Sequence, residues 1–219
     1  MAITFDMADP EARARGIDVA ASAVRRGDLV VLPTDTAYGV GCDAFSATGV
    51  GKLLAAKGRG RDLPVPVLIG SPQTLQGLGY SLSTSALRLA EAFWPGSLTL
   101  VVQHQPTLAW EIGSAGLIQI RMPLHPVAIE LLRVTGPMAV TAANGPGRPV
   151  PTTLAEAEAD LGAAVSVYLD GGPSLDLPPS TIVDVTGDRP RLLRPGAVGV
   201  EVLREVCPEL DAREPGAPH

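Results

Sequence analysis

Hydrogen-bonding side chains crowd the end of an apolar segment near the N-terminus. The run VVL is typical of a buried strand, and PTDTAYGVG follows it directly. The strand end therefore gathers the side chains of Thr34, Asp35, Thr36 and Tyr38. Their hydroxyl and carboxylate groups donate and accept hydrogen bonds, which is the chemistry of a ligand-binding loop rather than of a core.

Three more segments combine an apolar strand with a polar turn that contains glycine or proline. They are KGRGRDLPVPVLI, VTAANGPGRP, and the pair PSTIVDVT with RLLRPGAV. In open α/β sheets, ligands bind beyond the strand ends, where such turns converge. We therefore expect the four segments to build one ligand site.

The cationic side chains of these segments suit an anionic ligand. Lys57 and Arg59 belong to the second segment, and Arg121 and Arg194 stand at the ends of other apolar runs. Arginine binds carboxylate or phosphate in a fork, whereas lysine acts on phosphate as a point charge. Together with threonine and asparagine side chains, these groups suit an anionic ligand with a hydroxyl or amine partner, such as a nucleoside triphosphate and an amino acid.

Each segment also has an ordinary structural interpretation. Thr34 and Thr36 could be turn formers at a strand end, and Asn144 before Gly145 could serve its turn alone. The basic residues after Lys57 could be a solvated helix exit, because cations are favourable at helix C-termini. Four such segments in one short chain favour a shared site over four separate turns.

Several familiar catalytic patterns are missing or out of context. The residues from Gly39 to Ala44 match G-x-G-x-x-A, but a polar pentad separates them from the strand, unlike a dinucleotide-binding turn. The sequence has no G-x-x-x-x-G-K-[ST], no H-E-x-x-H and no G-x-S-x-G. Histidines 104, 125 and 219 have no metal-ligand spacing. We predict neither a metal site nor a hydrolase triad.

The composition indicates one soluble, cytoplasmic domain. The 219 residues are 46% hydrophobic, without a composition break, a repeat or an apolar run long enough for a membrane helix. Cys42 and Cys207 are too far apart in sequence to suggest a disulfide framework. The net charge of −6 argues against a broad nucleic-acid surface. We expect a catalytic domain over residues 1–207 and a flexible tail over 208–219.

The elements that must position these residues follow from the apolar periodicity. Helices are predicted over 10–26, 47–56, 84–93, 126–133, 154–161 and 198–206, with another beginning at 71. Strands are predicted over 29–32, 65–69, 98–103, 117–121, 138–141, 165–169, 181–185 and 191–194. Several strands are too close in sequence for a helical crossover, so an α/β fold with a mixed sheet is expected.

Six ordered motifs resemble the YrdC-like family, the L-threonylcarbamoyl-AMP synthases. They are PTDTAYGVGCDAF, KGRGRDLPVPVLIG, WPGSLTLVV, IRMPLHPVAIELL, AVTAANGPGRP and STIVDVTGDRPRLLRPGAV, and the likeness covers about Ala12 to Val206. The resemblance implies a compact single domain, a twisted mixed sheet with flanking helices around a deep basic cavity. It also implies condensation of L-threonine, bicarbonate and ATP to threonylcarbamoyl-AMP and pyrophosphate. In the family this product serves threonylcarbamoyl-adenosine formation beside the tRNA anticodon.

The resemblance also implies roles for individual residues. The catalytic pair would be Lys57 and Arg59 on the nucleotide phosphates, with Ala143, Asn144 and Arg194 also binding ATP. The threonine end would be lined by Thr34, Tyr38, Arg121, Thr141 and Thr181, with Arg121 as the partner of the carboxylate. Mg²⁺ would travel with the nucleotide, and no tightly bound cofactor is expected. The resemblance also implies transient contacts with tRNA or tRNA-modification proteins, and no association with a membrane.

The sequence departs from the family pattern in the segment after Thr141. Where the family usually reads S-A-N-x-S-G, Ala142 and Pro146 replace the two serines. A lost donor to a charged group could cost about 1.5–3 kcal/mol. The departure leaves two alternatives open: a specialised paralogue that makes a carbamoyl-adenylate from another amine, or a non-catalytic module that binds RNA or a nucleotide.

Overall fold

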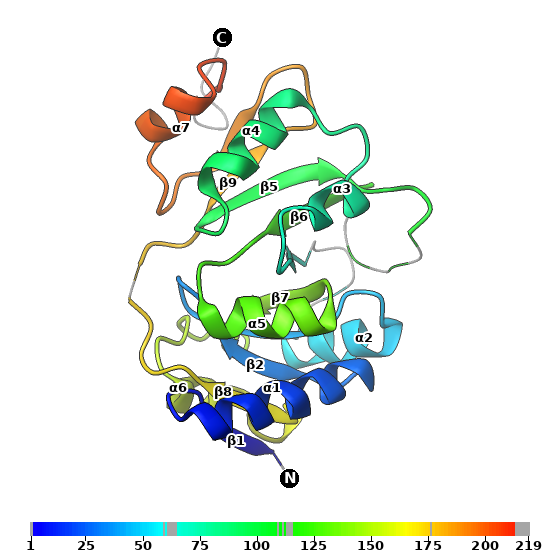
Figure 1. Cartoon of the computed structure of the whole chain (residues 1–219), viewed down its shortest axis with the longest axis vertical. Helices are drawn as coiled ribbons and strands as arrows, with labels where there is room; N and C mark the ends of the chain where they lie inside the picture. The colour runs from blue at the N-terminus through cyan, green and yellow to red at the C-terminus, as the bar shows by residue number, and fades with distance from the viewer. Residues whose placement is uncertain are drawn as a thin grey trace.

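The chain folds into a mixed α/β domain around one twisted sheet (Figure 1). The structure is a computed structural model, which describes residues 2–58, 60, 65–108, 110, 112, 116–175 and 177–212. Within these residues the sheet has ten strands. None of the helices in these ranges combines the length and the apolar character that crossing a membrane requires.

The elements alternate along the chain without a strict βαβ rhythm. The strands are β1 Ile3–Asp6, β2 Val30–Pro33, β3 Tyr38–Asp43, β4 Val67–Leu68, β5 Leu98–Gln103, β6 Leu117–Arg121, β7 Met138–Ala142, β8 Val167–Asp170, β9 Thr181–Asp184 and β10 Arg191–Arg194. The helices are α1 Pro10–Arg25, α2 Ala47–Ala56, α3 Thr74–Leu78, α4 Thr84–Phe93, α5 Pro126–Thr135, α6 Leu154–Leu161 and α7 Val200–Val206, with a 3₁₀ turn at Gly162–Ala164.

Strand order confirms the expected mixed sheet. The order is β1-β8-β2-β3-β7-β4-β6-β5-β9-β10. The pairs β1–β8, β2–β8, β4–β6 and β5–β9 are parallel, and the other neighbours are antiparallel. Because β5 runs antiparallel to β6, the carboxyl ends of β4 and β6 lie at the same edge of the sheet as the amino ends of β5 and β9.

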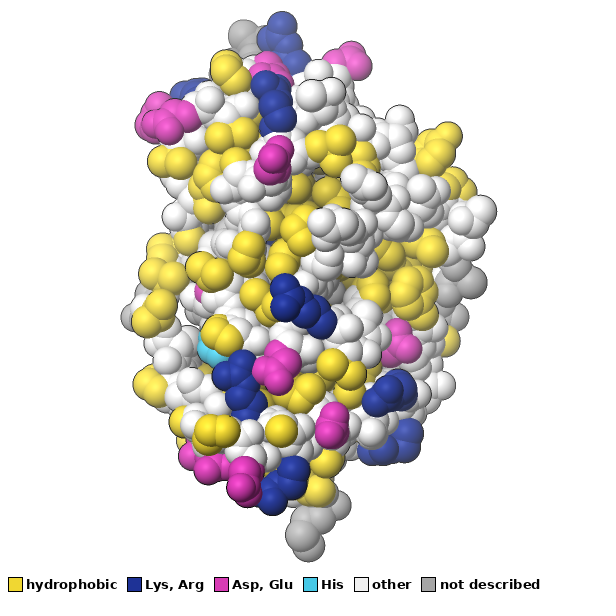
Figure 2. Space-filling view, in the orientation of Figure 1, with side chains coloured by type: hydrophobic (Ala, Val, Ile, Leu, Met, Phe, Trp, Pro, Cys, Tyr) yellow, Lys and Arg dark blue, Asp and Glu magenta, His cyan; other side chains and the backbone are white. Residues whose placement is uncertain are grey.

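Helices flank the sheet and form two apolar clusters with it. Helices α1 and α5 lie side by side (Figure 1) and pack through Ile17, Ala20 and Leu131 on the strands β2, β7 and β8. The other helices contribute to a second cluster that includes Leu53 and Leu89. On the face shown in Figure 2, acidic and basic side chains are interspersed among apolar ones.

Residues next to the helix ends account for where several helices begin. Asp9 caps α1 by accepting a hydrogen bond from the Ala12 amide, and Pro10 occupies the first turn. Helices α2, α4 and α6 have the predicted bounds. Helix α3 begins at Thr74 rather than near residue 71, without a side-chain cap. Strand β4 keeps only two of the five predicted residues.

Strands β1 and β3 were not predicted from the sequence. Strand β1 is a short edge strand, ITFD, in which the alternation of apolar and polar residues covers only four positions. Strand β3 contains Gly39 and Gly41, which suggested a turn. A Cβ on these glycines would lie 2.7 Å and 2.6 Å from the methyl groups of Val140 on the paired strand β7. The two glycines therefore allow close packing within a strand.

The first part of the expected tail packs on the domain. Leu210 is buried, the Asp211 amide donates to the Pro190 carbonyl at 2.8 Å, and the Asp211 carbonyl accepts from the Leu192 amide at 2.8 Å. Residues 210 and 211 therefore lie beside strand β10, and the domain boundary at residue 207 stays a prediction. The rest of the tail, 213–219, lies outside the described residues.

Replacing Gly196 with alanine should destabilise the fold. A Cβ at Gly196 would lie 2.7 Å from both the Ser180 carbonyl carbon and the Thr181 amide nitrogen, and backbone cannot turn aside as a side chain can. We expect a loss of about 1–3 kcal/mol in the free energy of unfolding, measured with urea. Gly199→Ala is the matched control, because no atom lies within 4 Å of its added Cβ. Equal stability of the two variants would contradict this packing.

Candidate active site

The polar turns meet around a cavity of about 600 Å³. It is lined by the turn after β2 and by residues of β3, β4, β5, β6, β7, β9 and β10, strands that are far apart in sequence. Five of the expected site residues line it, namely Thr34, Tyr38, Arg121, Thr141 and Arg194. Among the described lining residues, the charged side chains are those of the two arginines.

Arg121 ends strand β6 and is held from three sides. Its Nε donates to the Gly96 carbonyl at 3.0 Å, Nη1 to the Thr36 hydroxyl at 3.1 Å, and Nη2 to an oxygen of Asp35 at 2.6 Å. Burial lowers the pKa of Arg121, and the negative charge of Asp35 opposes that shift. The guanidinium therefore has a fixed orientation in the cavity wall.

Thr34 both lines the cavity and builds its own turn. Its hydroxyl donates to the Ala37 carbonyl at 2.6 Å and accepts from the Ala37 amide at 3.2 Å. Thr34 therefore stabilises its turn, as the structural interpretation suggested, and it also lines the cavity.

Arg194 is the last residue of strand β10, and its guanidinium donates hydrogen bonds to the segment before β9. Its Nε and Nη2 donate to the Ser180 carbonyl at 3.1 Å and 2.7 Å, and Nη2 also donates to the Ser180 hydroxyl at 3.1 Å. Burial and, secondarily, the positive charge of Arg121 lower the pKa of Arg194. Within the described part of the chain, no carboxylate forms an ion pair with Arg194. An anion bound between the two arginines would relieve their repulsion.

Lys57 lies just after α2 and binds the segment that follows β7. Its ammonium donates to the Ala142 carbonyl at 2.8 Å, to the Asn144 carbonyl at 2.5 Å and to the Asn144 side-chain oxygen at 2.6 Å. Lys57 is buried, and neither it nor Asn144 is among the residues that line the cavity. Arg59, the predicted partner of Lys57, lies outside the described residues.

The remaining predicted residues occupy different positions. Tyr38 is buried in the wall, where its hydroxyl donates to the Gly172 carbonyl at 2.6 Å. Burial and the nearby charge of Asp170 raise the pKa of Tyr38. The hydroxyl of Thr181 donates to the Val198 carbonyl at 2.8 Å. Thr181 and Ala143 are fully buried and do not line the cavity.

The structure adds site residues that the sequence did not single out. Ser180, Ile182 and Thr99 line the cavity, and the hydroxyls of Ser180 and Thr99 are 2.9 Å apart. Because side chains alternate along a strand, the neighbours of Thr181 face the cavity while Thr181 faces away. Asp35 pairs with Arg121 from outside the lining. The signal for Asp35 in the sequence was its position in the polar turn after β2.

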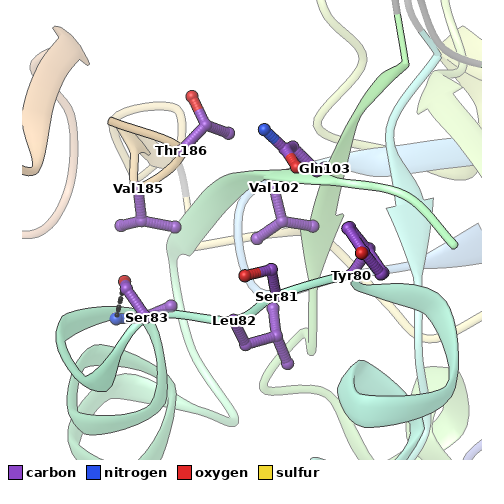
Figure 3. Close-up of a pocket in the computed structure, with 9 residues that line it drawn as sticks. Tyr80, Ser81, Leu82, Ser83, Val102, Gln103, Val185 and Thr186 are labelled. Atoms are coloured by element: carbon purple, nitrogen blue, oxygen red, sulfur yellow. Dashed lines mark hydrogen bonds between the residues drawn. The ribbon is translucent and has the colours of Figure 1, made fainter. Parts of the chain in front are cut away.

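A smaller pocket of about 70 Å³ lies between the loop before α4 and strand β5 (Figure 3). Its walls include Tyr80, Ser81, Gln103 and Thr186, and the Ser83 hydroxyl beside them caps α4 by accepting from the Ala86 amide. It contains none of the predicted site residues and shares no lining residue with the larger cavity. We therefore place the candidate active site in the larger cavity.

The fold and the larger cavity define an α/β protein with a cavity that two arginines line at the ends of their strands. The model of the Sua5/YciO/YrdC family, described by the words "telomere recombination", matches residues 22–196. This chain therefore belongs to the Sua5/YciO/YrdC family, which confirms the resemblance seen in the six motifs.

Named relatives and solved structures agree with this membership. A Mycobacterium tuberculosis protein, named as a candidate threonylcarbamoyl-AMP synthase, is 56% identical over 207 residues, which are 94% of this chain and 95% of the relative. A Pyrococcus abyssi protein named threonylcarbamoyl-AMP synthase is 35% identical over 89% of this chain and 58% of its own length. The structure of P. abyssi Sua5 complexed with L-threonine is 33% identical and superposes with a TM-score of 0.88. The match covers 96% of this chain and 62% of that one.

Proposed function

We propose that this protein is an L-threonylcarbamoyladenylate synthase. The amine of L-threonine attacks bicarbonate with loss of water, or the carbon dioxide derived from it with loss of a proton, and either route gives a carbamate. A carbamate oxygen then attacks the α-phosphorus of ATP, a P–O bond forms, and pyrophosphate leaves with the electrons of the broken bond. The product, threonylcarbamoyl-AMP, supplies the group that modifies adenosine beside the tRNA anticodon, which places the enzyme in the cytoplasm with transient tRNA or tRNA-modification partners.

One observation carries this proposal: two arginines from distant strands line one cavity in a fold that superposes on an L-threonine complex. An amino acid and a nucleotide both bring anionic groups, and fixed guanidinium groups bind these without rearrangement. The proposed chemistry needs no covalent enzyme nucleophile, because carbamate attack on phosphorus depends on positioning and on stabilisation of charge.

In this proposal the threonine end of the cavity is built around Arg121. Three of its five N–H donors are already used by Gly96, Thr36 and Asp35, which leaves two for the substrate carboxylate. The hydroxyls of Thr34 and Thr141 contribute polar contacts, Tyr38 supports the wall, and Thr181 holds the strand behind it. The two arginines among the lining residues support the basic cavity that the family resemblance implies.

The nucleotide end is assigned to the basic groups on the other segments. Lys57, Arg59 and Arg194 bind the phosphates of ATP, with Ala143 and Asn144 in the turn after β7. Mg²⁺ arrives on the triphosphate and is held mainly by phosphate oxygens and water.

Because Ala142 and Pro146 replace the two serines of the family pattern, the identity of the amine substrate is the first property to test. Ala142 lines the cavity at a position where the family usually has a serine, and its carbonyl accepts a hydrogen bond from Lys57. We expect L-threonine and bicarbonate together to trigger pyrophosphate release from MgATP, measured with a coupled assay across all amino acids. Release with another amine alone would indicate a specialised paralogue. Salt-sensitive RNA binding without release would indicate a binding module.

Replacing Arg194 with lysine should weaken nucleotide binding selectively. Lysine lacks the planar fork that holds the Ser180 carbonyl and hydroxyl, although it keeps the charge. We expect KM for ATP to rise about tenfold and KM for L-threonine to change less than about threefold. Arg191→Lys, at an exposed position of the same strand, is the control. Equal effects on both substrates would contradict the assignment of Arg194 to the nucleotide end.

A further inference from the structure

Asp35 ties together three segments beside the cavity: its own turn, the end of strand β6 with the residues that follow it, and the segment before β5. It lies in the turn between β2 and β3, and Oδ1 accepts from Arg121 Nη2 at 2.6 Å and from the Leu124 amide at 3.0 Å. Oδ2 accepts from the Ser97 hydroxyl at 2.5 Å. Both oxygens are therefore engaged, and Asp35 is only 7% exposed. Since Asp35 is not among the lining residues, it acts on a ligand through its neighbours.

We propose that Asp35 is a positioning residue, which orients Arg121 so that the two unused N–H groups of the guanidinium receive the carboxylate of the amino-acid substrate. This inference rests on the proposed function, in which that carboxylate meets Arg121. The remaining contacts of Arg121, to Gly96 and Thr36, are neutral. Asp35 is thus its one charged partner among the described residues, and charge-assisted hydrogen bonds are the stronger ones.

The pairing of Asp35 with Arg121 also gives the two arginines different roles: Arg121 binds the amino acid, and Arg194 binds the nucleotide. Asp35 holds the Arg121 guanidinium in one direction, so Arg121 offers two directional donors to a singly charged carboxylate. Arg194 has no ion-pair partner in the described part of the chain, so it keeps its full charge for the more highly charged phosphates. A misoriented Arg121 would therefore impair amino-acid binding and leave nucleotide binding largely intact.

Two substitutions separate the geometry of Asp35 from its charge. In Asp35→Asn, the amide oxygen can still accept from Arg121 and Leu124, and the NH₂ group can donate to a Ser97 hydroxyl that reverses its direction. Asp35→Ala removes all three hydrogen bonds. The matched control is Asp43→Ala at the far end of strand β3, where the Asp43 carboxylate accepts only the nearby Phe45 amide among the described residues.

The test measures KM for L-threonine, KM for ATP and kcat of the full chain. We expect Asp35→Ala to raise KM for L-threonine about ten- to a hundredfold, with KM for ATP changed less than about threefold. Asp35→Asn should stay within about threefold of the wild type in every constant, and Asp43→Ala should match the wild type. An unchanged KM for L-threonine in Asp35→Ala would overturn the proposal. Equal losses of kcat in Asp35→Ala and Asp35→Asn would also overturn it, because charge rather than position would then matter.

A spectroscopic readout keeps this inference separate from the proposed function. The Arg121 Nε–H, which donates to the Gly96 carbonyl, should give an NMR signal whose exchange with water is at least about tenfold faster in Asp35→Ala than in Asp35→Asn. Equal exchange rates would overturn the positioning role. If the wild type releases no pyrophosphate with any amine, the proposed function fails, and the exchange rates still decide whether Asp35 orients Arg121.

Discussion

Replacing Lys57 with alanine is expected to reduce threonylcarbamoyl-AMP formation by at least about a hundredfold while the protein stays folded. The ammonium group holds two carbonyls and one side-chain oxygen of the segment after β7, and it is the proposed counter-charge for the phosphates. Losing these charged hydrogen bonds should cost about 1.5–3 kcal/mol, or a Tm roughly 3–12 °C lower. Product formation is measured by mass spectrometry and Tm by circular dichroism.

Lys52 provides the matched control for this prediction, because the chain contains no other lysine. Its side chain is 45% exposed and pairs with Asp28 on the surface at 2.8 Å. Lys52→Ala should change stability by less than about 1 kcal/mol and leave turnover unchanged. Unchanged turnover in Lys57→Ala would remove the phosphate role. A similar loss in Lys52→Ala would show that the assay responds to positive charge in general.

Replacing Arg121 with methionine is expected to lower the free energy of unfolding by about 3–5 kcal/mol and to abolish L-threonine binding. Methionine keeps much of the side-chain volume but leaves the buried Asp35 carboxylate without its charged partner. Urea unfolding measures the first effect, and isothermal titration calorimetry with L-threonine measures the second.

The double variant Arg121→Met/Asp35→Asn separates these two effects. It should be more stable than Arg121→Met alone, because the unpaired buried charge is gone, yet it should still fail to bind L-threonine. Arg191→Met, at a side chain that is 62% exposed, should change stability by less than about 0.5 kcal/mol. A double variant no more stable than the single one would contradict a buried ion pair between Arg121 and Asp35.

Local signals in the sequence were sufficient for most of the elements. The cap at Asp9 and the apolar periodicity of residues 84–93 depend only on neighbours within the chain, and the structure has both features. Strand β3 was missed because Gly39 and Gly41 indicate a turn until Val140 is known to pack against them. That contact joins segments about a hundred residues apart, so no local pattern contains it.

The candidate site shows the same division between local and tertiary information. Arg121 and Arg194 were identified from their places at strand ends, and the fold brings both to one cavity. The choice between Thr181 and Ser180 depends on which face of β9 turns inward, and a shift of one residue reverses that face. The role of Asp35 depends on Ser97 and Leu124, whose positions follow only from the tertiary fold.

Mass spectrometry of the nucleotide product tests the central claim most directly. Purified protein is incubated with MgATP, L-threonine and ¹³C-labelled bicarbonate, and parallel reactions contain unlabelled bicarbonate or no threonine. We expect threonylcarbamoyl-AMP that carries the label, together with pyrophosphate, and neither product without threonine. ATP that stays intact with L-threonine and with every other amino acid would contradict the assignment of this cavity to carbamoyl-adenylate synthesis.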